Sequence, residues 1–335
     1  MQEALLWHKE RNGVRCELCA RRCFISKDKY GYCMVRKNAD NKLLTLNYGK
    51  VQDVAFDKVE RRPLFHFYPD STNMSLTIPG GNFPPVDASK LFKDRRQEEA
   101  VGKDYTPEQI VKMAEEKGVG AISFSAVEPF MHFEFAYRVA KLSHRSNIKN
   151  IFVTNGFTTE EAVKKIAKFL DAVVVNLQAS LDKEFYAKFL DVQDTRVVFA
   201  AVKQFKKQRV HMEITNTIIP QVGDNIDQCK KVAEWVNAEI GSEVPLHILQ
   251  FHYDPKLAEV PPTPVSTLEK CIEVSNRAGI RYVYIGGLPK HELESTICYN
   301  CREPLVLREG GKVKKIQLMK DRCPNCGLRI SMIVE

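Results

Sequence analysis

The sequence predicts an α/β protein with a parallel sheet, on two observations. Between residues 74 and 285, short apolar segments alternate with amphipathic helical patterns, as in folds that join parallel strands by helices. The helical patterns begin at capping residues, and two of them end at glycines that stand just before an apolar segment. The expected strands are 74–78, 120–125, 150–154, 172–177, 210–218, 246–251 and 281–285.

The helix starts and ends support this alternation. Thr106-Pro107-Glu108-Gln109 and Thr158-Thr159-Glu160-Glu161 are capping boxes, in which the first side chain and the fourth satisfy each other's backbone amides. Thr263-Pro264 is expected to be an N-cap with proline at the first helical position. Gly118 and Gly279 stand where helices should end.

The first seventy residues, 1–70, are predicted to form a basic, cysteine-rich metal-binding module. Its four candidate ligands are Cys16, Cys19, Cys23 and Cys33. A Cys-x2-Cys turn directs two sulfurs at one ion, and tetrahedral zinc takes four such ligands. Zinc is the first choice and a [4Fe-4S] cluster the alternative, because thiolate ligands by themselves do not separate the two. Short strands are expected at 43–48 and 51–56.

The tail, 290–335, is predicted to be a zinc ribbon. Two Cys-x2-Cys knuckles are joined by a strand-rich basic segment, and their ligands are Cys298, Cys301, Cys323 and Cys326. So small a segment needs its metal in place of a core, so the metal should have a structural role. The two remaining cysteines, Cys229 and Cys271, lie in helical patterns and are expected to be buried structural thiols.

The net charge of +8 is concentrated at the two ends of the chain. Residues 1–70 hold 14 Lys and Arg against 9 Asp and Glu, 71–289 are balanced, and 290–335 hold 9 against 6. Such basic ends favour contact with phosphate, although a solvated charged face is the alternative reading. The candidate nucleic-acid-binding residues are Arg15, Arg21, Arg22, Arg36, Lys37, Lys312, Lys314 and Lys315.

Nothing in the sequence suggests a membrane protein or a secreted one. No apolar run approaches the ~18 residues of a membrane span, and the first residues lack the apolar core of a signal peptide. Cysteines at Cys-x2-Cys spacing without a secretion signal indicate metal sites and not disulfides. The expected location is the cytoplasm.

Nearly the whole chain resembles the radical SAM superfamily, and within it the AmmeMemoRadiSam-system and pyruvate formate-lyase activating enzyme-like proteins. The resemblance implies a partial (β/α)6, TIM-like barrel over 71–289. It rests on the N-terminal cysteine module, the C-terminal ribbon, and the following shorter stretches: Arg62-Pro63-Leu64-Phe65-His66-Phe67, Gly80, Asn82-Phe83, Glu128-Pro129, Phe152-Val153-Thr154-Asn155-Gly156, Ile219-Pro220, Phe251-His252, Pro261-Pro262-Thr263-Pro264 and Arg281-Tyr282-Val283-Tyr284.

The departures from this family concentrate at its site. The family places three cluster cysteines in the loop after the first barrel strand, and here those positions are Gly81, Pro85 and Ala88. None of the three can bind iron as a thiolate. The family's Asp-x-Lys becomes Asn176-Leu177-Gln178, and an arginine before Phe251 becomes Gln250. The resemblance therefore implies a degenerate barrel with no radical SAM cluster and no catalytic residues of its own.

These observations leave three interpretations. The first is a catalytically inactive radical SAM-like protein, stabilised by zinc, that binds RNA or a ribosomal subunit through its basic ends. The second is an enzyme, with a non-standard cluster on the N-terminal cysteines or with cluster-free chemistry at the barrel mouth, where Glu128, Asn176, Gln178, His252 and His66 are available. The third is a protein-interaction scaffold without nucleic acid.

Overall fold

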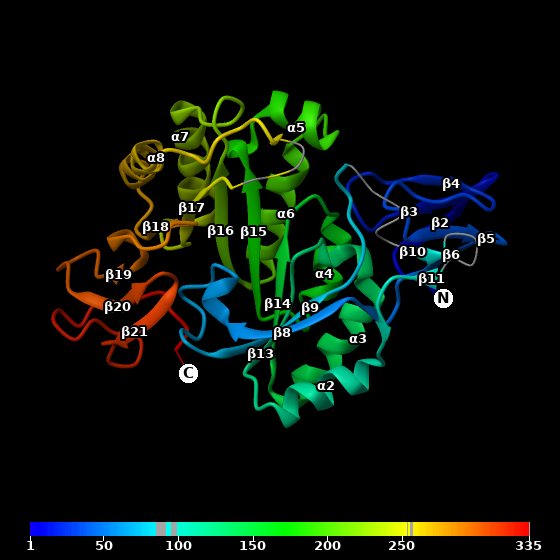
Figure 1. Ribbon diagram of the computed structural model, residues 1–335, viewed down its shortest axis with the longest axis horizontal. Helices are drawn as coiled ribbons and strands as arrows, with labels where there is room; N and C mark the ends of the chain where they lie inside the picture. The colour runs from blue at the N-terminus through cyan, green and yellow to red at the C-terminus, as the bar shows by residue number, and fades with distance from the viewer. Residues whose placement is uncertain (85–91, 95–98, 253, 255–256, 335) are drawn as a thin grey trace. The chain divides into compact units, whose positions relative to one another are not determined.

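The computed structural model describes residues 1–84, 92–94, 99–252, 254 and 257–334 (Figure 1). Contacts divide the chain into two compact units, each assembled from separate segments. Unit 1 comprises Met1–Asp57, Thr72–Val173 and Arg196–Val210. Unit 2 comprises Lys58–Ser71, Val174–Thr195 and His211–Glu335. This division differs from the expected one, because it separates 58–71 from the N-terminal module and places the ribbon with the second half of the sheet.

All seven expected strands of the mostly parallel sheet are confirmed. In unit 1 the strand order is β14-β13-β9-β8, and Ala121 of β13 stands between Asn73 of β9 and Lys149 of β14 in parallel register. In unit 2 the order is β18-β17-β16-β15, with β17 parallel to both of its neighbours. The bounds are β8 Asp53–Lys58, β9 Thr72–Thr77, β13 Ala121–Phe124, β14 Lys149–Thr154, β15 Ala172–Gln178, β16 His211–Ile218, β17 Leu246–Gln250 and β18 Val283–Gly286.

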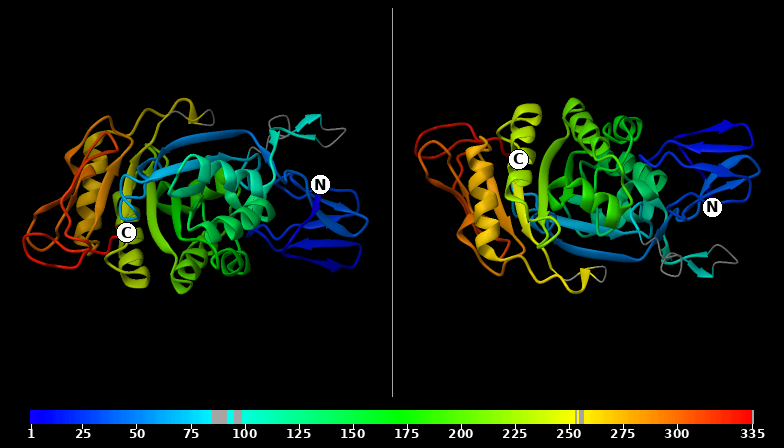
Figure 2. Two further views of the ribbon diagram at one scale, coloured as in Figure 1. Left: turned by 90° about the horizontal axis from the view of Figure 1, so that it is seen from below. Right: turned by 90° about the horizontal axis from the view of Figure 1, so that it is seen from above.

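The helices follow the sheet strands in the expected alternation. Those of unit 1 are α2 Pro107–Glu116, η2 Pro129–His132, α3 Phe133–Ser143, η3 His144–Ser146, α4 Glu160–Ile166 and α6 Arg196–Lys207. Those of unit 2 are η1 Val59–Arg61, η4 Ala179–Leu181, α5 Lys183–Leu190, α7 Ile226–Trp235, η5 Val236–Ile240 and α8 Val265–Arg277. Figure 2 shows α7 and α8 in two further views. Among the described residues, no helix is both long enough and apolar enough to cross a membrane.

The capping predictions are confirmed in part. Thr106 forms the expected capping box with Gln109. The second helix is capped by Thr159, whose side chain accepts a hydrogen bond from the amide of Ala162. The expectation for Thr263 is wrong, because α8 is preceded by Pro264. The Thr263 hydroxyl instead donates to the carbonyl of Ile218 at 2.6 Å and accepts from the amide of Phe251 at 3.0 Å.

The N-terminal module of unit 1 consists of small antiparallel sheets. Their orders are β1-β6-β5 and β2-β3-β4; β7 pairs with β12 of a later segment of unit 1, in which β10 also pairs with β11. The bounds are β1 Gln2–Glu3, β2 Trp7–Glu10, β3 Gly13–Cys16, β4 Phe24–Ser26, β5 Arg36–Ala39, β6 Lys42–Thr45, β7 Lys50–Val51, β10 Phe92–Asp94, β11 Glu99–Ala100 and β12 Lys103–Asp104.

A buried ion pair holds this module to the first turn of α3. Both terminal nitrogens of Arg36 donate to the carboxylate of Glu134 at 2.8 Å, and the same carboxylate accepts the amide of Leu5 at 2.7 Å. The side chains of Arg36 and Glu134 are each only 1% exposed. Paired charges in such a place are costly to separate, because removing one leaves the other buried and uncompensated.

A second buried carboxylate, Glu213 of β16, organises unit 2. It accepts the amides of Phe65 and His66 at 3.0 and 2.7 Å, and it lies 2.7 Å from the ring of His247 on β17. Burial opposes its ionisation, but hydrogen bonds from His211 and His247 outweigh burial and hold the pKa of Glu213 below its ordinary value. The Phe65-His66 segment is therefore part of the scaffold of unit 2.

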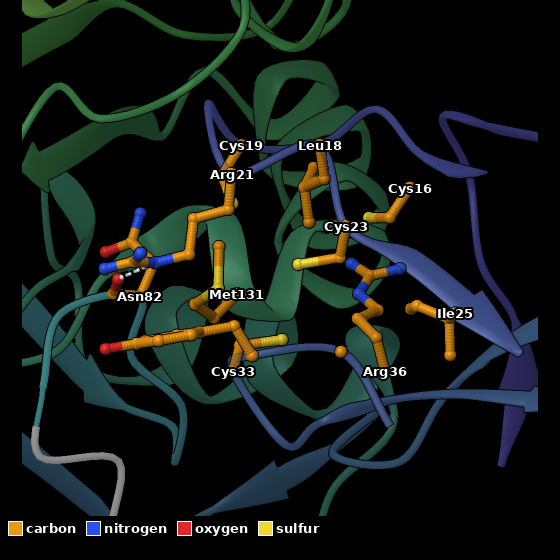
Figure 3. Close-up of a pocket in the computed structure, with 12 residues that line it drawn as sticks. Cys16, Leu18, Cys19, Arg21, Cys23, Ile25, Cys33, Arg36, Asn82 and Met131 are labelled. Atoms are coloured by element: carbon orange, nitrogen blue, oxygen red, sulfur yellow. Dashed lines mark hydrogen bonds between the residues drawn. The ribbon is translucent and has the colours of Figure 1, made fainter. Parts of the chain in front are cut away.

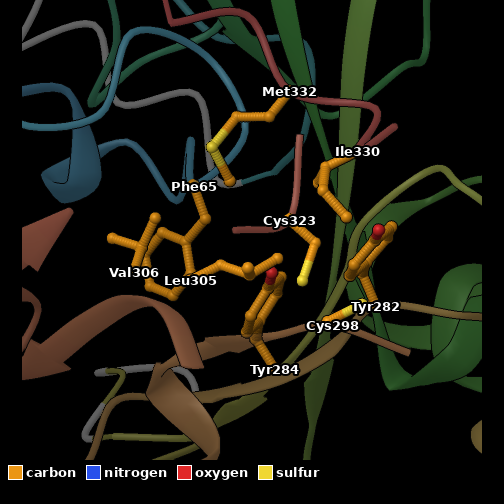
Figure 4. Packing of buried hydrophobic residues seen from close by; sticks show 9 residues of the cluster. All are labelled: Phe65, Tyr282, Tyr284, Cys298, Leu305, Val306, Cys323, Ile330 and Met332. Atoms are coloured by element: carbon orange, nitrogen blue, oxygen red, sulfur yellow. The ribbon is translucent and has the colours of Figure 1, made fainter. Parts of the chain in front are cut away.

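The ribbon strands form a three-stranded sheet in the order β19-β20-β21, with bounds β19 Thr296–Ile297, β20 Pro304–Glu309 and β21 Lys312–Ile316, preceded by η7 Glu292–Glu294. Figure 4 shows Cys298 and Cys323 packed among Phe65, Tyr282 and Tyr284. The chain end joins this cluster, since the amide of Tyr68 donates to the carbonyl of Ile333 at 2.6 Å. The ribbon core and the core of unit 2 are thus continuous.

Replacing Glu134 should destabilise unit 1 strongly. In Glu134→Ala, Arg36 keeps its charge in a buried place without a partner, so we expect a loss of ~3–5 kcal/mol in the free energy of unfolding in urea. Glu108→Ala is the matched control, because Glu108 pairs with Arg138 on the surface at 3.3 Å and its loss should cost at most ~1 kcal/mol. Equal losses in the two variants would contradict the role given to the buried pair.

Replacing Cys323 should loosen unit 2 beyond the ribbon. Loss of the metal in Cys323→Ser would expose the cluster that includes Phe65 and Tyr282, so we expect faster amide hydrogen exchange in 58–71 and 281–286 as well as in the ribbon. Lys320→Ala, at an exposed ribbon position, is the control and should leave all three segments protected. Deprotection confined to 296–332 would show that the cores are independent after all.

Candidate functional site

Four cysteines of the N-terminal module surround one cavity. Cys16 ends β3, Cys19 and Cys23 follow in the loop to β4, and Cys33 precedes β5. Figure 3 shows their side chains around the cavity, which Leu18, Arg21, Arg36 and Met131 also line. The cavity itself measures about 10 Å³, and the space not filled by atoms, including its open mouth, is about 330 Å³. The sequence prediction that these four residues gather at one place therefore agrees with the geometry.

The electrostatics of these thiols are dominated by burial. Burial raises the pKa of Cys16 and Cys19, and it raises the pKa of Cys33 to about 12. The positive charge of Arg36 acts in the opposite direction on Cys16 and Cys33. Thiols in such surroundings stay protonated on their own, whereas a metal ion that binds them displaces their protons.

The C-terminal edge of the parallel strands in unit 1 is closed by its own hydrogen bonds. Asn82, in the loop after β9, accepts at Oδ1 from the side chain of Asn155 at 2.8 Å and donates from Nδ2 to the carbonyl of Phe157 at 3.0 Å. The Arg21 Nε donates to the carbonyl of Asn82 at 2.8 Å. Asn47 fixes the start of the same loop through the carbonyl of Pro79 at 2.6 Å. The loop is therefore bound both to the N-terminal module and to the end of β14.

Glu128 lies at the same edge, after β13, and its carboxylate is also occupied. It accepts from the Thr154 hydroxyl at 2.7 Å, the Asn155 amide at 2.9 Å and the Phe130 amide at 3.4 Å. Burial raises the pKa of Glu128 to about 7, against the opposing effect of these hydrogen bonds. Such a pKa suits an acid or base at neutral pH, but both oxygens are already engaged with the protein.

The residues of the loop after β9 do not fit a cluster held by three thiolates. Gly81 has no side chain, and apart from its two chain neighbours no atom of the described residues lies within 4 Å of the position that a Cβ would occupy there. Pro85 and Ala88 lie outside the described residues, and neither carries sulfur. Iron–sulfur clusters require thiolate or imidazole ligands, so no reaction step through a cluster at this loop follows from this chain.

The C-terminal edge of the strands in unit 2 is also internally bonded. Ala179, Ser180 and Leu181 have φ values of 46°, 52° and 55°, a left-handed turn directly after β15. Asn216 of β16 holds this turn by accepting the Ser180 amide and donating to the Ser180 hydroxyl, both at 2.9 Å. Asn176 likewise accepts from the hydroxyl of Thr215 at 2.7 Å.

The two candidate histidines, His66 and His252, do not lie with the polar groups at the C-terminal strand ends that are described above. His66 is fully buried near the N-terminal ends of β16 and β17, where its ring contacts Tyr284 at 2.6 Å. Burial lowers the pKa of His66 to about 4. His66 is therefore at the wrong end of the strands for a mouth residue, and that expectation is corrected. His252 is exposed and lies 2.8 Å from the carbonyl of Gly287.

The candidate nucleic-acid-binding role is wrong for Arg36, whose side chain is buried, and Arg21 is half-buried. Arg36 is buried against Glu134, and Arg21 stacks on the ring of Tyr32 at 3.5 Å. The other two arginines are exposed in part but paired, as Arg15 forms two bonds of 2.9 Å to Glu10 and Arg22 contacts Glu17 and Glu161. Lys37 is partly exposed and lies 5.6 Å from the ring of Tyr30.

The candidate lysines of the ribbon are exposed, and contact with nucleic acid stays a prediction for them. Lys312, Lys314 and Lys315 are all exposed along β21, which forms one edge of its sheet. The four ribbon cysteines, Cys298, Cys301, Cys323 and Cys326, hold their sulfur atoms within 4.8 Å of one another, as a metal site requires. Cys229 and Cys271 are buried between helices, as expected.

Arg36 is a site residue whose role the sequence did not indicate. The sequence suggested a surface contact, whereas the side chain forms a buried ion pair. Its partner Glu134 is 98 positions away in the chain, and no local pattern marks such a pair. The basic run from residue 11 to residue 37 instead drew attention to a surface role. Asn82 and Asn155 occur in stretches that resemble the family, but no pattern in the sequence indicates the hydrogen bond between them.

Comparisons with known proteins agree with this fold. Residues 91–236 match the Radical SAM superfamily. The chain is 35% identical to the "Uncharacterized protein MJ0808" of Methanocaldococcus jannaschii over the full length of both. It is 21% identical to the 4-hydroxyphenylacetate decarboxylase activating enzyme of Clostridium scatologenes, over 45% of this chain and 49% of that one.

Two solved structures are similar to this chain at lower sequence identity. A radical SAM methyltransferase from Sphaerobacter thermophilus has a TM-score of 0.50 and 15% identity, covering 66% of this chain and 67% of that one. A domain of the pyruvate-formate lyase-activating enzyme from Bacteroides vulgatus has a TM-score of 0.44 and 19% identity, covering 50% of this chain and 99% of that domain. Residues 91–236 therefore belong to the radical SAM superfamily, and the α/β fold shared with the methyltransferase agrees with this match.

Proposed function

We propose that this protein uses the radical SAM fold without radical SAM chemistry, as a metal-stabilised binding protein. The observation that carries the proposal is the network around Asn82. The polar groups at the C-terminal strand edge of unit 1, where α/β folds bind their ligands, are bonded to one another and to the N-terminal module. The partial (β/α)6 barrel implied by the resemblance is part of the proposal.

The absence of thiols at the family's ligand positions supports the same conclusion. Gly81, Pro85 and Ala88 provide no iron ligand. The two prolines at 84 and 85 also remove two amide donors. A site that holds and cleaves S-adenosylmethionine would need free polar groups in place of the bonded Asn82, Glu128 and Asn155.

The protein should therefore not cleave S-adenosylmethionine. After anaerobic incubation with S-adenosylmethionine and dithionite, we expect no 5′-deoxyadenosine above the enzyme-free blank by liquid chromatography. A pyruvate formate-lyase activating enzyme is the positive control. Product that appears with the wild type and disappears in Cys19→Ser/Cys33→Ser would reject this proposal and assign an enzyme activity to the N-terminal cysteines.

Binding of RNA or a ribosomal particle is a second candidate function, favoured by one observation. Lys312, Lys314 and Lys315 are exposed on the edge strand β21. Among the described residues, the carboxylate partner of Lys314 is Glu309, at 3.9 Å. The apolar side chains of Ile316 and Met319 nearby are 43% and 62% exposed. Cations beside apolar groups suit a strand that meets phosphates and bases.

Charge reversal on this strand should weaken RNA binding. We expect Lys314→Glu/Lys315→Glu to lower the affinity for RNA in low-salt filter binding roughly tenfold, since each lost phosphate contact removes counterion release. Lys112→Glu/Lys164→Glu, at exposed helical positions, changes the net charge equally and should have little effect. If neither RNA nor ribosomal subunits bind the wild type above a neutral control protein, the partner is a protein and the scaffold interpretation replaces this one.

A further inference from the structure

The two cysteine quartets differ in the spacing of their sulfur atoms. In the ribbon, the Sγ atoms of Cys298 and Cys326 are 3.7 Å apart and those of Cys301 and Cys323 are 3.5 Å apart. A tetrahedral zinc ion with bonds of ~2.3 Å places its ligand sulfurs ~3.8 Å apart. The ribbon quartet therefore has the dimensions of a single-ion site.

The N-terminal quartet is wider. Cys16, Cys19, Cys23 and Cys33 line one cavity. The four ribbon sulfur atoms lie within 4.8 Å of one another, whereas the four N-terminal sulfur atoms, all of them described, do not form such a metal-binding group. In a cubane cluster each thiolate binds its own iron, so the thiolates stand further apart than around one ion. We propose that these four cysteines bind a [4Fe-4S] cluster and not zinc.

An unpartnered buried donor beside the cavity supports this assignment. Arg36 lines the cavity and its terminal nitrogens donate to Glu134, but its buried Nε has no hydrogen-bond partner in the described part of the chain. A buried donor left unsatisfied costs ~1–3 kcal/mol. The sulfides and thiolates of a cluster are acceptors for such a donor, and hydrogen bonds to sulfur tune these clusters. A single zinc ion offers only its four thiolates.

The size of the cavity does not decide against a cluster. Its volume of about 10 Å³ suits one small atom, which by itself would favour a single ion. Leu18 and Met131 contribute to this lining (Figure 3), and both are side chains with several rotamers. The empty space that the four thiols border, mouth included, is about 330 Å³, so movement of these two side chains gives a cluster room.

Four protein ligands make the assigned cluster coordinatively complete. It has no open iron for S-adenosylmethionine, unlike a cluster with three cysteines. The assignment therefore goes beyond the proposed function and does not depend on it. The cluster would hold the loops of the N-terminal module together, with Arg36 as a positioning residue that links it to α3.

Metal and sulfide analysis of anaerobically purified protein tests the assignment. For the wild type we expect about four iron, about four acid-labile sulfide and one zinc per chain. Cys19→Ser/Cys33→Ser should lose the iron and keep the zinc. The matched control Cys301→Ser/Cys326→Ser should lose the zinc and keep the iron.

If the variants fail to fold, spectroscopy and metal analysis of the wild type still test the cluster assignment. After reduction with dithionite, we expect the electron paramagnetic resonance signal of a [4Fe-4S] cluster, unchanged by added S-adenosylmethionine because no iron is open. Two zinc and less than about a tenth of an iron per chain, even after reconstitution with ferrous iron and sulfide, would overturn the assignment. A signal that S-adenosylmethionine shifts would overturn the four-ligand assignment, whereas 5′-deoxyadenosine formation alone bears on the proposed function.

The role of Arg36 has its own readout. Arg36→Met/Glu134→Met removes both buried charges together and keeps apolar volume, which folded proteins tolerate better than loss of one partner. Without the Nε donor the cluster should keep its iron but show a more negative reduction potential. An unchanged potential would mean that Arg36 serves only the fold.

Discussion

The bidentate pair between Arg36 and Glu134 is the interaction on which the organisation of unit 1 depends. It joins the N-terminal module to α3 through two 2.8 Å hydrogen bonds, and a third bond fixes Leu5 to the same carboxylate. Because both charges are almost completely buried, neither can be solvated if the other moves away. The four cysteines are therefore held beside η2 and the loop after β9 at a defined place.

The attachment of the N-terminal module to α3 explains why the polar groups at the C-terminal strand edge of unit 1 are already hydrogen-bonded. The N-terminal module supplies Arg21 and Asn47 as donors to the carbonyls of the loop after β9. Asn82 and Asn155 then satisfy each other, and Glu128 is satisfied by the end of β14. Polar groups at the usual ligand edge of an α/β fold are thus engaged within the protein.

The two cysteine quartets are integrated with their surroundings in different ways. In the ribbon, Cys298 and Cys323 pack into the apolar cluster of unit 2 around Phe65, Tyr282 and Tyr284, so a metal there supports a continuous core. In the N-terminal module the thiols border a cavity beside a buried guanidinium. Cysteines at similar Cys-x2-Cys spacing thus lie in two different environments, an apolar core and a cavity beside a guanidinium. Their spacing in the sequence does not distinguish these environments.

The sequence by itself determined the elements and the ligand groups. Hydrophobic periodicity located the seven expected sheet strands, capping residues located the starts of α2 and α4, and Cys-x2-Cys spacing grouped the ribbon cysteines, because these signals are local. Only the tertiary structure decided the partners of Arg36, the role of His66 near Glu213, and the division into two units. Those outcomes depend on contacts between segments up to 265 positions apart, and in such contacts burial and charge pairing act between residues whose proximity no local pattern encodes.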